Sequence, residues 1–179
     1  WTFGASAILF LPPDDDAYIS PIVTADRATL HLEARYNYED LETASLFAGW
    51  NLESGDDVLL ALTPMAGLVF GNTDGVVPGV EAGVAWRAFE LYTEAEYVIA
   101  FDDDADDFLY AWVETTGAVA TWLRLGLAGQ RTRVYDTGLE MQRGLMAAVA
   151  HGAMSAGAYW FNPDRSEDQL FVFAAGYEW

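Results

Sequence analysis

The stretch at residues 169–179 reads QLFVFAAGYEW, and every second position from residue 171 onward is apolar or aromatic. These positions are Phe171, Phe173, Ala175, Tyr177 and Trp179. They share one face of a predicted strand, because successive side chains of a β-strand point to opposite faces. Large rings near the end of a chain need an apolar cover to be held in place. The stretch therefore predicts a strand with one face covered along its whole length.

The same period of two recurs along the chain. Residues 28–40 read ATLHLEARYNYED, in which Leu30, Leu32, Ala34, Tyr36 and Tyr38 alternate with His31, Glu33, Arg35 and Asn37. Residues 76–89 and 90–101 alternate in the same way. This pattern is typical of strands with one apolar and one polar face.

Turn-forming residues divide the chain into strands of similar length. Eleven breaks rich in Asp, Gly, Pro, Asn or other polar residues include LPPDDDA at 11–17, WRAFE at 86–90 and ETTGAV at 114–119. They separate twelve predicted strands of roughly 15 residues each with the turn, which suits strands of about 9–11 residues tilted across a bilayer. Long acidic breaks alternate with tight breaks, so the long connections lie at one end of the barrel and the short turns at the other. An even number of strands then brings both termini to the short-turn end.

The amount of apolar surface separates two kinds of barrel. A soluble lipocalin-like ligand-binding barrel would turn its apolar face inward, whereas a membrane barrel turns it toward lipid. Twelve strands that each carry four or five apolar residues on one face would overfill the interior of a soluble barrel. We therefore expect an all-β protein with a single domain over residues 1–179, an antiparallel up-and-down transmembrane β-barrel of about 12 strands. A soluble lipocalin-like barrel that binds a ligand is the third functional hypothesis, after the two membrane-barrel functions described below.

Composition limits the classes of function. The chain has 28 acidic residues against eight arginines, no lysine and no cysteine, and a formal net charge of −20. Such a chain repels nucleic-acid phosphates and has no disulfide or thiolate metal site. The Asp-rich segments at 14–16 and 102–107 lack the glycine and glutamate of an EF-hand loop, so we expect no metal and no cofactor. The chain begins at Trp1 inside a predicted strand, which suggests that a leader was removed.

The ending FVFAAGYEW resembles the C-terminal signature of bacterial outer-membrane β-barrel proteins, whose last strand ends on an aromatic residue that the assembly machinery reads. The resemblance implies a bacterial outer-membrane location, with the lipid bilayer and the barrel assembly machinery as partners. It assigns Phe171, Phe173, Tyr177 and Trp179 to the membrane girdle and assembly signal, with Tyr177 and Trp179 on the periplasmic side. Divalent ions could also bridge the acidic loops to lipopolysaccharide. Porins, lipases, adhesins and assembly factors share this signature, so it does not decide the function.

The polar face of each strand predicts the lining of the lumen. The candidate lumen residues are His31, Glu33, Arg35, Glu81, Arg87, Glu94, Glu96, Glu114 and Arg124. Twelve strands close at a backbone radius of roughly 12 Å, which leaves a void about 10 Å across unless long side chains cross it. We expect a small passive channel or porin for ions or small solutes, with a net acidic lumen. The alternative is a structural or interaction barrel whose lumen is closed by its own salt bridges.

Two further questions concern single residues. Catalysis is not expected, because His31 and His151 both fall near the short-turn end, away from the outer rim where a lipase would meet its substrate. Arg131, Arg133 and Arg143 share the parity of the outward leucines. Either they stand above the membrane, or a β-bulge near Gly129 turns them inward, and both possibilities stay open.

Overall fold

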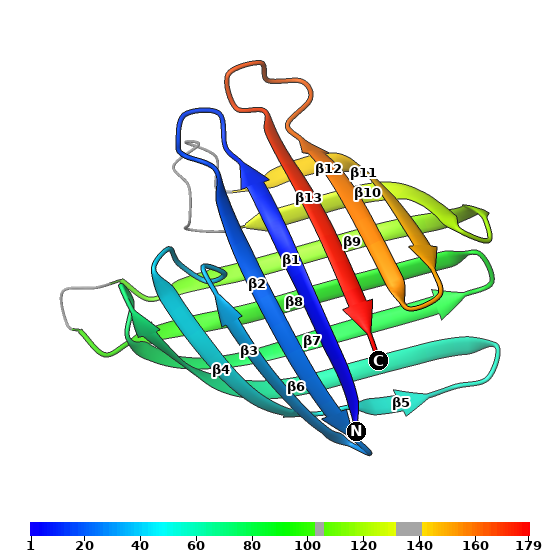
Figure 1. Ribbon diagram of the computed structural model, residues 1–179, viewed down its shortest axis with the longest axis horizontal. Helices are drawn as coiled ribbons and strands as arrows, with labels where there is room; N and C mark the ends of the chain where they lie inside the picture. The colour runs from blue at the N-terminus through cyan, green and yellow to red at the C-terminus, as the bar shows by residue number, and fades with distance from the viewer. Residues whose placement is uncertain (103–105, 132–140) are drawn as a thin grey trace.

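The structure, a computed structural model, describes residues 1–102, 106–131 and 141–179, which form a closed antiparallel barrel (Figure 1). Each long strand pairs with its neighbours in sequence, β1 pairs with β13, and β4 pairs with β6. The ring therefore has no open edge along its length, and the predicted all-β up-and-down barrel of twelve strands is confirmed. No helix in the described ranges is long and apolar enough to cross a membrane.

The strands have the following bounds: β1 Thr2–Leu11, β2 Tyr18–Arg27, β3 Leu30–Tyr36, β4 Thr43–Trp50, β5 Leu52–Ser54, β6 Val58–Gly71, β7 Gly75–Trp86, β8 Phe89–Ala100, β9 Phe108–Ala120, β10 Leu123–Arg131, β11 Gln142–His151, β12 Met154–Phe161 and β13 Leu170–Glu178.

The short strand β5 continues β4 and is not a separate wall strand. Gly49 of β4 pairs with Met65 of β6, and Leu52 of β5 pairs with Leu62, so the register is the same on both sides of the gap. The gap faces Pro64, which has no backbone N–H to donate to the neighbouring strand. One strand interrupted opposite a proline thus accounts for thirteen strand segments in a twelve-strand wall.

The two ends of the barrel differ in the length of their connections. Turns of two or three residues join β2 to β3, β5 to β6, β7 to β8, β9 to β10 and β11 to β12, and longer connections lie mainly at the other end. Both termini lie at the short-turn end, where Phe3 and Trp179 exchange two backbone hydrogen bonds of 2.9 Å. The predicted turn at 114–119 is wrong, because β9 runs through it to Ala120. Its β-branched Thr115, Thr116 and Val119 suit a strand.

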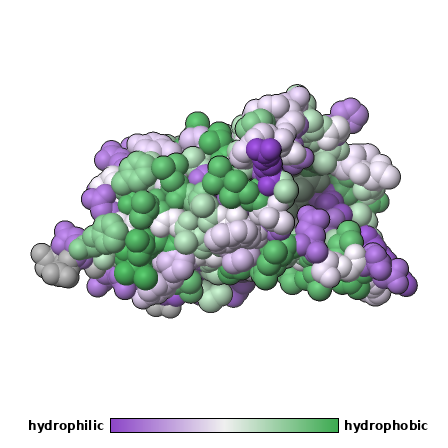
Figure 2. Space-filling model, turned by 90° about the horizontal axis from the view of Figure 1, so that it is seen from below, coloured by the Kyte–Doolittle hydropathy of each residue, from purple (hydrophilic) through white to green (hydrophobic). Residues whose placement is uncertain are grey.

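The outer wall is apolar over most of its height. Leu46, Leu60, Leu68, Leu127 and Leu145 are each about half exposed and point outward from the barrel. Figure 2 shows hydrophobic side chains over much of one side of the molecule, with hydrophilic residues at its ends and in places between. Water would not be a favourable solvent for so continuous an apolar surface.

Exposed aromatic residues border this wall at both ends. The short-turn end carries Trp1, Trp50, Trp86, Trp122, Tyr177 and Trp179, and the long-loop end carries Tyr36, Phe70, Tyr97, Phe101, Trp160 and Phe171. Tyr177 and Trp179 stack on each other with ring centroids 5.7 Å apart, and Phe171 stacks on Trp160 at 6.1 Å. The outward face of β13 therefore reaches both aromatic girdles, with Phe173 between them.

Candidate functional site in the barrel interior

The interior is organised around Arg35, which projects from the loop-side end of β3. Its guanidinium is almost fully buried and meets carboxylates from two strands, its own β3 and β8. Nη1 donates to Glu94 Oε1 and to Glu96 Oε1, both at 2.8 Å, and Nε donates to Glu33. Glu94 and Glu96 share the inward face of β8, because they are two residues apart in a strand. One guanidinium thus joins β3 to β8 across the lumen.

Two more carboxylates and two rings complete the surroundings of Arg35. Glu39 Oε1 lies 3.5 Å from Nη1, and Glu81 Oε1 lies 3.9 Å from Nη2. The guanidinium carbon lies 4.4 Å from the ring centroid of Tyr38 and 4.7 Å from that of Phe47. Stacking of this kind supports a buried guanidinium where water is excluded. We call Arg35 with Glu33, Glu39, Glu81, Glu94 and Glu96 the Arg35 cluster.

A hydrogen-bonded chain extends from the Arg35 cluster toward the short-turn end. His31 Nε2 lies 3.1 Å from Glu33 Oε2, and His31 Nδ1 lies 2.8 Å from Asp26 Oδ1. Asp26 also accepts from Asn51 at 2.6 Å, and Asn51 accepts from Thr63 at 2.8 Å. Polar groups on β2, β3 and β6 are satisfied by one another along this side of the lumen.

The position of Tyr38 corrects the sequence-based prediction. The alternation placed it on the outward face, but β3 ends at Tyr36 and Asn37 has a φ of 56°. A residue in this left-handed conformation ends the strand's alternation. Tyr38 therefore turns inward and donates a hydrogen bond of 2.8 Å to Glu94 Oε2.

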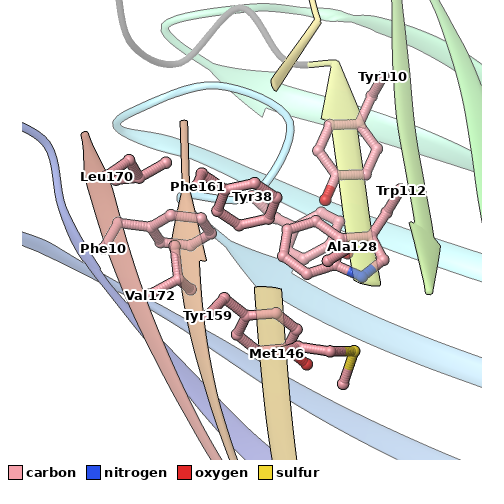
Figure 3. Close-up of a cluster of buried hydrophobic side chains, with 10 residues drawn as sticks. All are labelled: Phe10, Tyr38, Tyr110, Trp112, Ala128, Met146, Tyr159, Phe161, Leu170 and Val172. Carbon is pink, nitrogen blue, oxygen red and sulfur yellow. The ribbon is translucent and has the colours of Figure 1, made fainter. Parts of the chain in front are cut away.

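Apolar side chains close the interior on the loop side. Tyr38 joins a buried cluster with Phe10, Tyr110, Trp112, Ala128, Met146, Tyr159, Phe161, Leu170 and Val172 (Figure 3). On the opposite wall, Phe47, Met65, Val69, Val77 and Val98 form a second buried cluster. The expected void about 10 Å across is therefore filled at this level, because long side chains cross it from both walls.

The short-turn half of the interior is hollow. A cavity of ≈ 240 Å³ lies against the Arg35 cluster and is lined by Glu33, Arg35, Glu81 and Glu94, among others. It shares Ile22 and Thr24 with a cavity of ≈ 640 Å³ that reaches the β11–β12 turn. Small inward residues such as Gly4, Ser6 and Gly176 leave this space open.

The other predicted lumen residues fall into two groups. Glu114 faces inward, where its Oε1 accepts from Trp112 Nε1 and from the Tyr159 hydroxyl, both at 2.7 Å. Arg124 lies near the short-turn mouth and pairs with Glu90 at 3.0 Å. Arg87 does not line the lumen, because it occupies the β7–β8 turn with a φ of 55° and its guanidinium lies over the Trp86 ring. The predicted strand face does not continue through that turn.

The interior also contains residues that sequence reasoning did not select. Glu39 lies in a loop where no strand parity applies, yet it is buried and accepts a hydrogen bond of 2.8 Å from Ser45. Tyr92 shares the inward face of β8 with Glu94, and Trp112 and Tyr159 face inward from β9 and β12. The parity of β8 was available from sequence. Trp112 has the parity of the predicted lumen residue Glu114, two residues later in the same strand, whereas no face was predicted for Tyr159.

The structure describes two of the three arginines of uncertain facing. Arg131 and Arg143 face outward at the loop-side ends of β10 and β11, and the β10–β11 register is continuous past Gly129. Arg143 Nη2 lies 2.8 Å from Asp164 Oδ2. A backbone hydrogen bond, together with this guanidinium, lowers the pKa of Asp164. Both arginines therefore stand at the rim, and Arg133 lies outside the described residues.

The histidines take part in no catalytic arrangement with a serine within the described ranges. His31 is held between two carboxylates, and His151 is exposed at the end of β11. No group of three or more His, Asp or Glu side chains among the described residues is arranged to hold a metal ion.

The closed wall, its outward apolar surface and the aromatic residues at both of its ends define a transmembrane β-barrel of the type found in bacterial outer membranes. The fold is similar to that of the outer membrane protein Omp33 of Acinetobacter baumannii, with a TM-score of 0.53, 13% identity, and coverage of 100% of this chain and 98% of that one. The outer membrane channel DcaP of the same organism aligns at a TM-score of 0.35 and 10% identity, over 99% and 95% of the chains. No family model and no curated protein sequence matches the chain.

The orientation of the barrel can be tested by cysteine labelling, because the chain has no native cysteine. We expect a cysteine at Asp15, in the long β1–β2 loop, to react with a membrane-impermeant maleimide on intact cells. A cysteine at Gly152, in the β11–β12 turn, should react only after the cells are broken. Labelling of Gly152→Cys on intact cells would reverse the orientation.

Proposed function

We propose that this protein is a small passive channel that prefers cations, with its constriction at the Arg35 cluster. The observation that carries the proposal is the charge of the interior. Glu33, Glu39, Glu81, Glu94 and Glu96 surround the guanidinium of Arg35, and Glu114 borders the cavity beside them. The Arg124 charge nearer the mouth is balanced by Glu90. Six carboxylates against one arginine favour cations and repel anions in a narrow lumen.

The geometry of the lumen supports a low conductance. The cavities on the short-turn side reach the Arg35 cluster, and beyond it the two buried apolar clusters fill the interior. Passage requires these side chains to move, so the current through one barrel should be small. A wide, permanently open porin is a poorer fit to this interior.

A reversal potential across a KCl gradient tests the proposal. We expect the unmodified protein to prefer K⁺ over Cl⁻, most clearly near 0.1 M salt, where the Debye length is about 10 Å. Replacing Glu81 and Glu114 together with Gln should move the reversal potential toward zero, because both carboxylates border the cavity. The matched control, Asp14→Asn with Asp15→Asn, removes two charges from an exposed loop and should change it less. Anion preference in the unmodified protein would contradict the proposal.

The second candidate is a structural or interaction barrel with a permanently closed lumen. The two buried apolar clusters favour it, because Val77, Val98, Phe161, Leu170 and Val172 have no solvent exposure. Such a barrel would present its acidic loops as the working surface. Absence of any single-channel current from folded protein in a planar bilayer would decide for this candidate.

A further inference from the structure

The ≈ 240 Å³ cavity beside the Arg35 cluster has walls suited to one class of ligand. Inward residues of eight strands surround it, together with Tyr38 of the β3–β4 loop, so most of its shape is set by the barrel wall. Its size lies below the range of about 300–1,000 Å³ that is usual for drug-sized ligands. The cavity therefore suits a small molecule that enters from the short-turn end.

Two of the four carboxylates that border the cavity, Glu81 and Glu114, lack a close basic partner among the described residues. Glu33, Glu81, Glu94 and Glu114 line it, and Arg35 is the one basic residue among its lining residues. Glu81 has only the 3.9 Å contact with Arg35 and accepts no hydrogen bond from the described residues. Both donors to Glu114 meet Oε1, which leaves Oε2 without a hydrogen bond from the described part of the chain. A cation in the cavity would meet two carboxylates with unused acceptor sites.

Aromatic rings form much of the remaining wall. Tyr38, Tyr92, Trp112 and Tyr159 all line the cavity. Trp112 and Tyr159 meet edge to face, with centroids 5.2 Å apart, and both are anchored through Glu114. Arg35 already lies over the Tyr38 ring, so this environment holds one organic cation of the protein itself. Rings and carboxylates together are the recognition chemistry of alkylated ammonium groups.

We propose that this cavity binds small organic cations of the substituted-ammonium class, which makes them the preferred substrates of the channel proposed above. The inference rests on that function for the route of transport, whereas binding itself does not require conduction. An alkylated ammonium is weakly hydrated, so it loses little on leaving water and gains contact with the Tyr92, Trp112 and Tyr159 rings. A compact inorganic cation has no such gain at the rings.

Calorimetric titration of the folded, detergent-solubilised protein with choline tests the inference. We expect choline to bind, and its neutral isostere 3,3-dimethylbutan-1-ol to bind at least about tenfold more weakly, because the isostere lacks the charge. Tyr92→Leu should weaken choline binding about fivefold, and Tyr92→Phe, which keeps the ring, should stay within about twofold of the parent. Equal binding of choline and its isostere, or an unchanged affinity in Tyr92→Leu, would overturn the proposal.

The reversal potential of the same variants separates this inference from the channel function. The reversal potential reports on the interior carboxylates, whereas the choline titration reports on the rings. Cation-selective current without discrimination between choline and its isostere would reject the binding site alone. Discrimination between the two without any current would support the binding site and reject the channel.

Discussion

Replacement of Arg35 by methionine is expected to lower the free energy of unfolding by about 3–5 kcal/mol, the usual cost of removing one partner from a buried ion pair. The guanidinium is the shared partner of Glu33, Glu94 and Glu96, and all three of these side chains are buried. Methionine fills a similar length but leaves the carboxylates without a counter-charge in a site with little water. Urea unfolding in phospholipid vesicles, followed by tryptophan fluorescence, measures the change.

Two comparisons separate loss of charge from loss of packing. Arg124→Met removes an arginine whose partner Glu90 is half exposed, and exposed pairs contribute only about 0–1 kcal/mol. The decrease in the free energy of unfolding caused by Arg35→Met should also be smaller when urea unfolding is measured at acidic pH, because neutral carboxyl groups need no counter-charge. An equal loss at acidic and neutral pH would show that Arg35 stabilises the barrel by packing alone.

The strands of the barrel wall and their two faces were predictable because they depend on the alternation of neighbouring residues in the sequence. Alternation in residues 28–36, 76–86 and 90–101 gives each strand its inward and outward faces, and a strand has only these two faces. The prediction failed where the backbone leaves the strand conformation. Asn37 and Arg87 both have positive φ, and the residues at these points do not follow the parity of the preceding strand.

The centre of the interior was only partly predictable because it depends on contacts across the barrel. Sequence places Glu94 and Glu96 on one face, but nothing local shows that Arg35, about sixty residues earlier, reaches both of them. The contact between Trp112 of β9 and Tyr159 of β12 likewise could not be read from either strand alone. Aromatic residues are expected at a membrane surface, yet a narrow barrel also needs large side chains to fill its interior.

The lipid-facing wall is tested by placing a charge in the middle of it. Leu127→Arg is expected to lower the free energy of unfolding in vesicles by about 2–4 kcal/mol, the cost of arginine at the bilayer midplane of such barrels. Leu127 is the central residue of β10, is 61% exposed, and lies beside the outward Leu145 of β11. An arginine there would lie opposite Leu145 of β11 and Thr115 of β9, neither of which is an acidic partner, and the rim is half a strand away.

The same strand supplies the matched control. Arg131 has the outward parity of Leu127 and lies four residues further along β10, or about 14 Å, at the loop-side rim. Arg131→Leu should therefore change the free energy of unfolding by no more than about 1 kcal/mol, because arginine near the membrane interface costs little. A depth-dependent penalty for one residue type on one strand face is specific to a bilayer. If Leu127→Arg unfolds at the same urea concentration as the parent, that face of β10 does not lie against lipid.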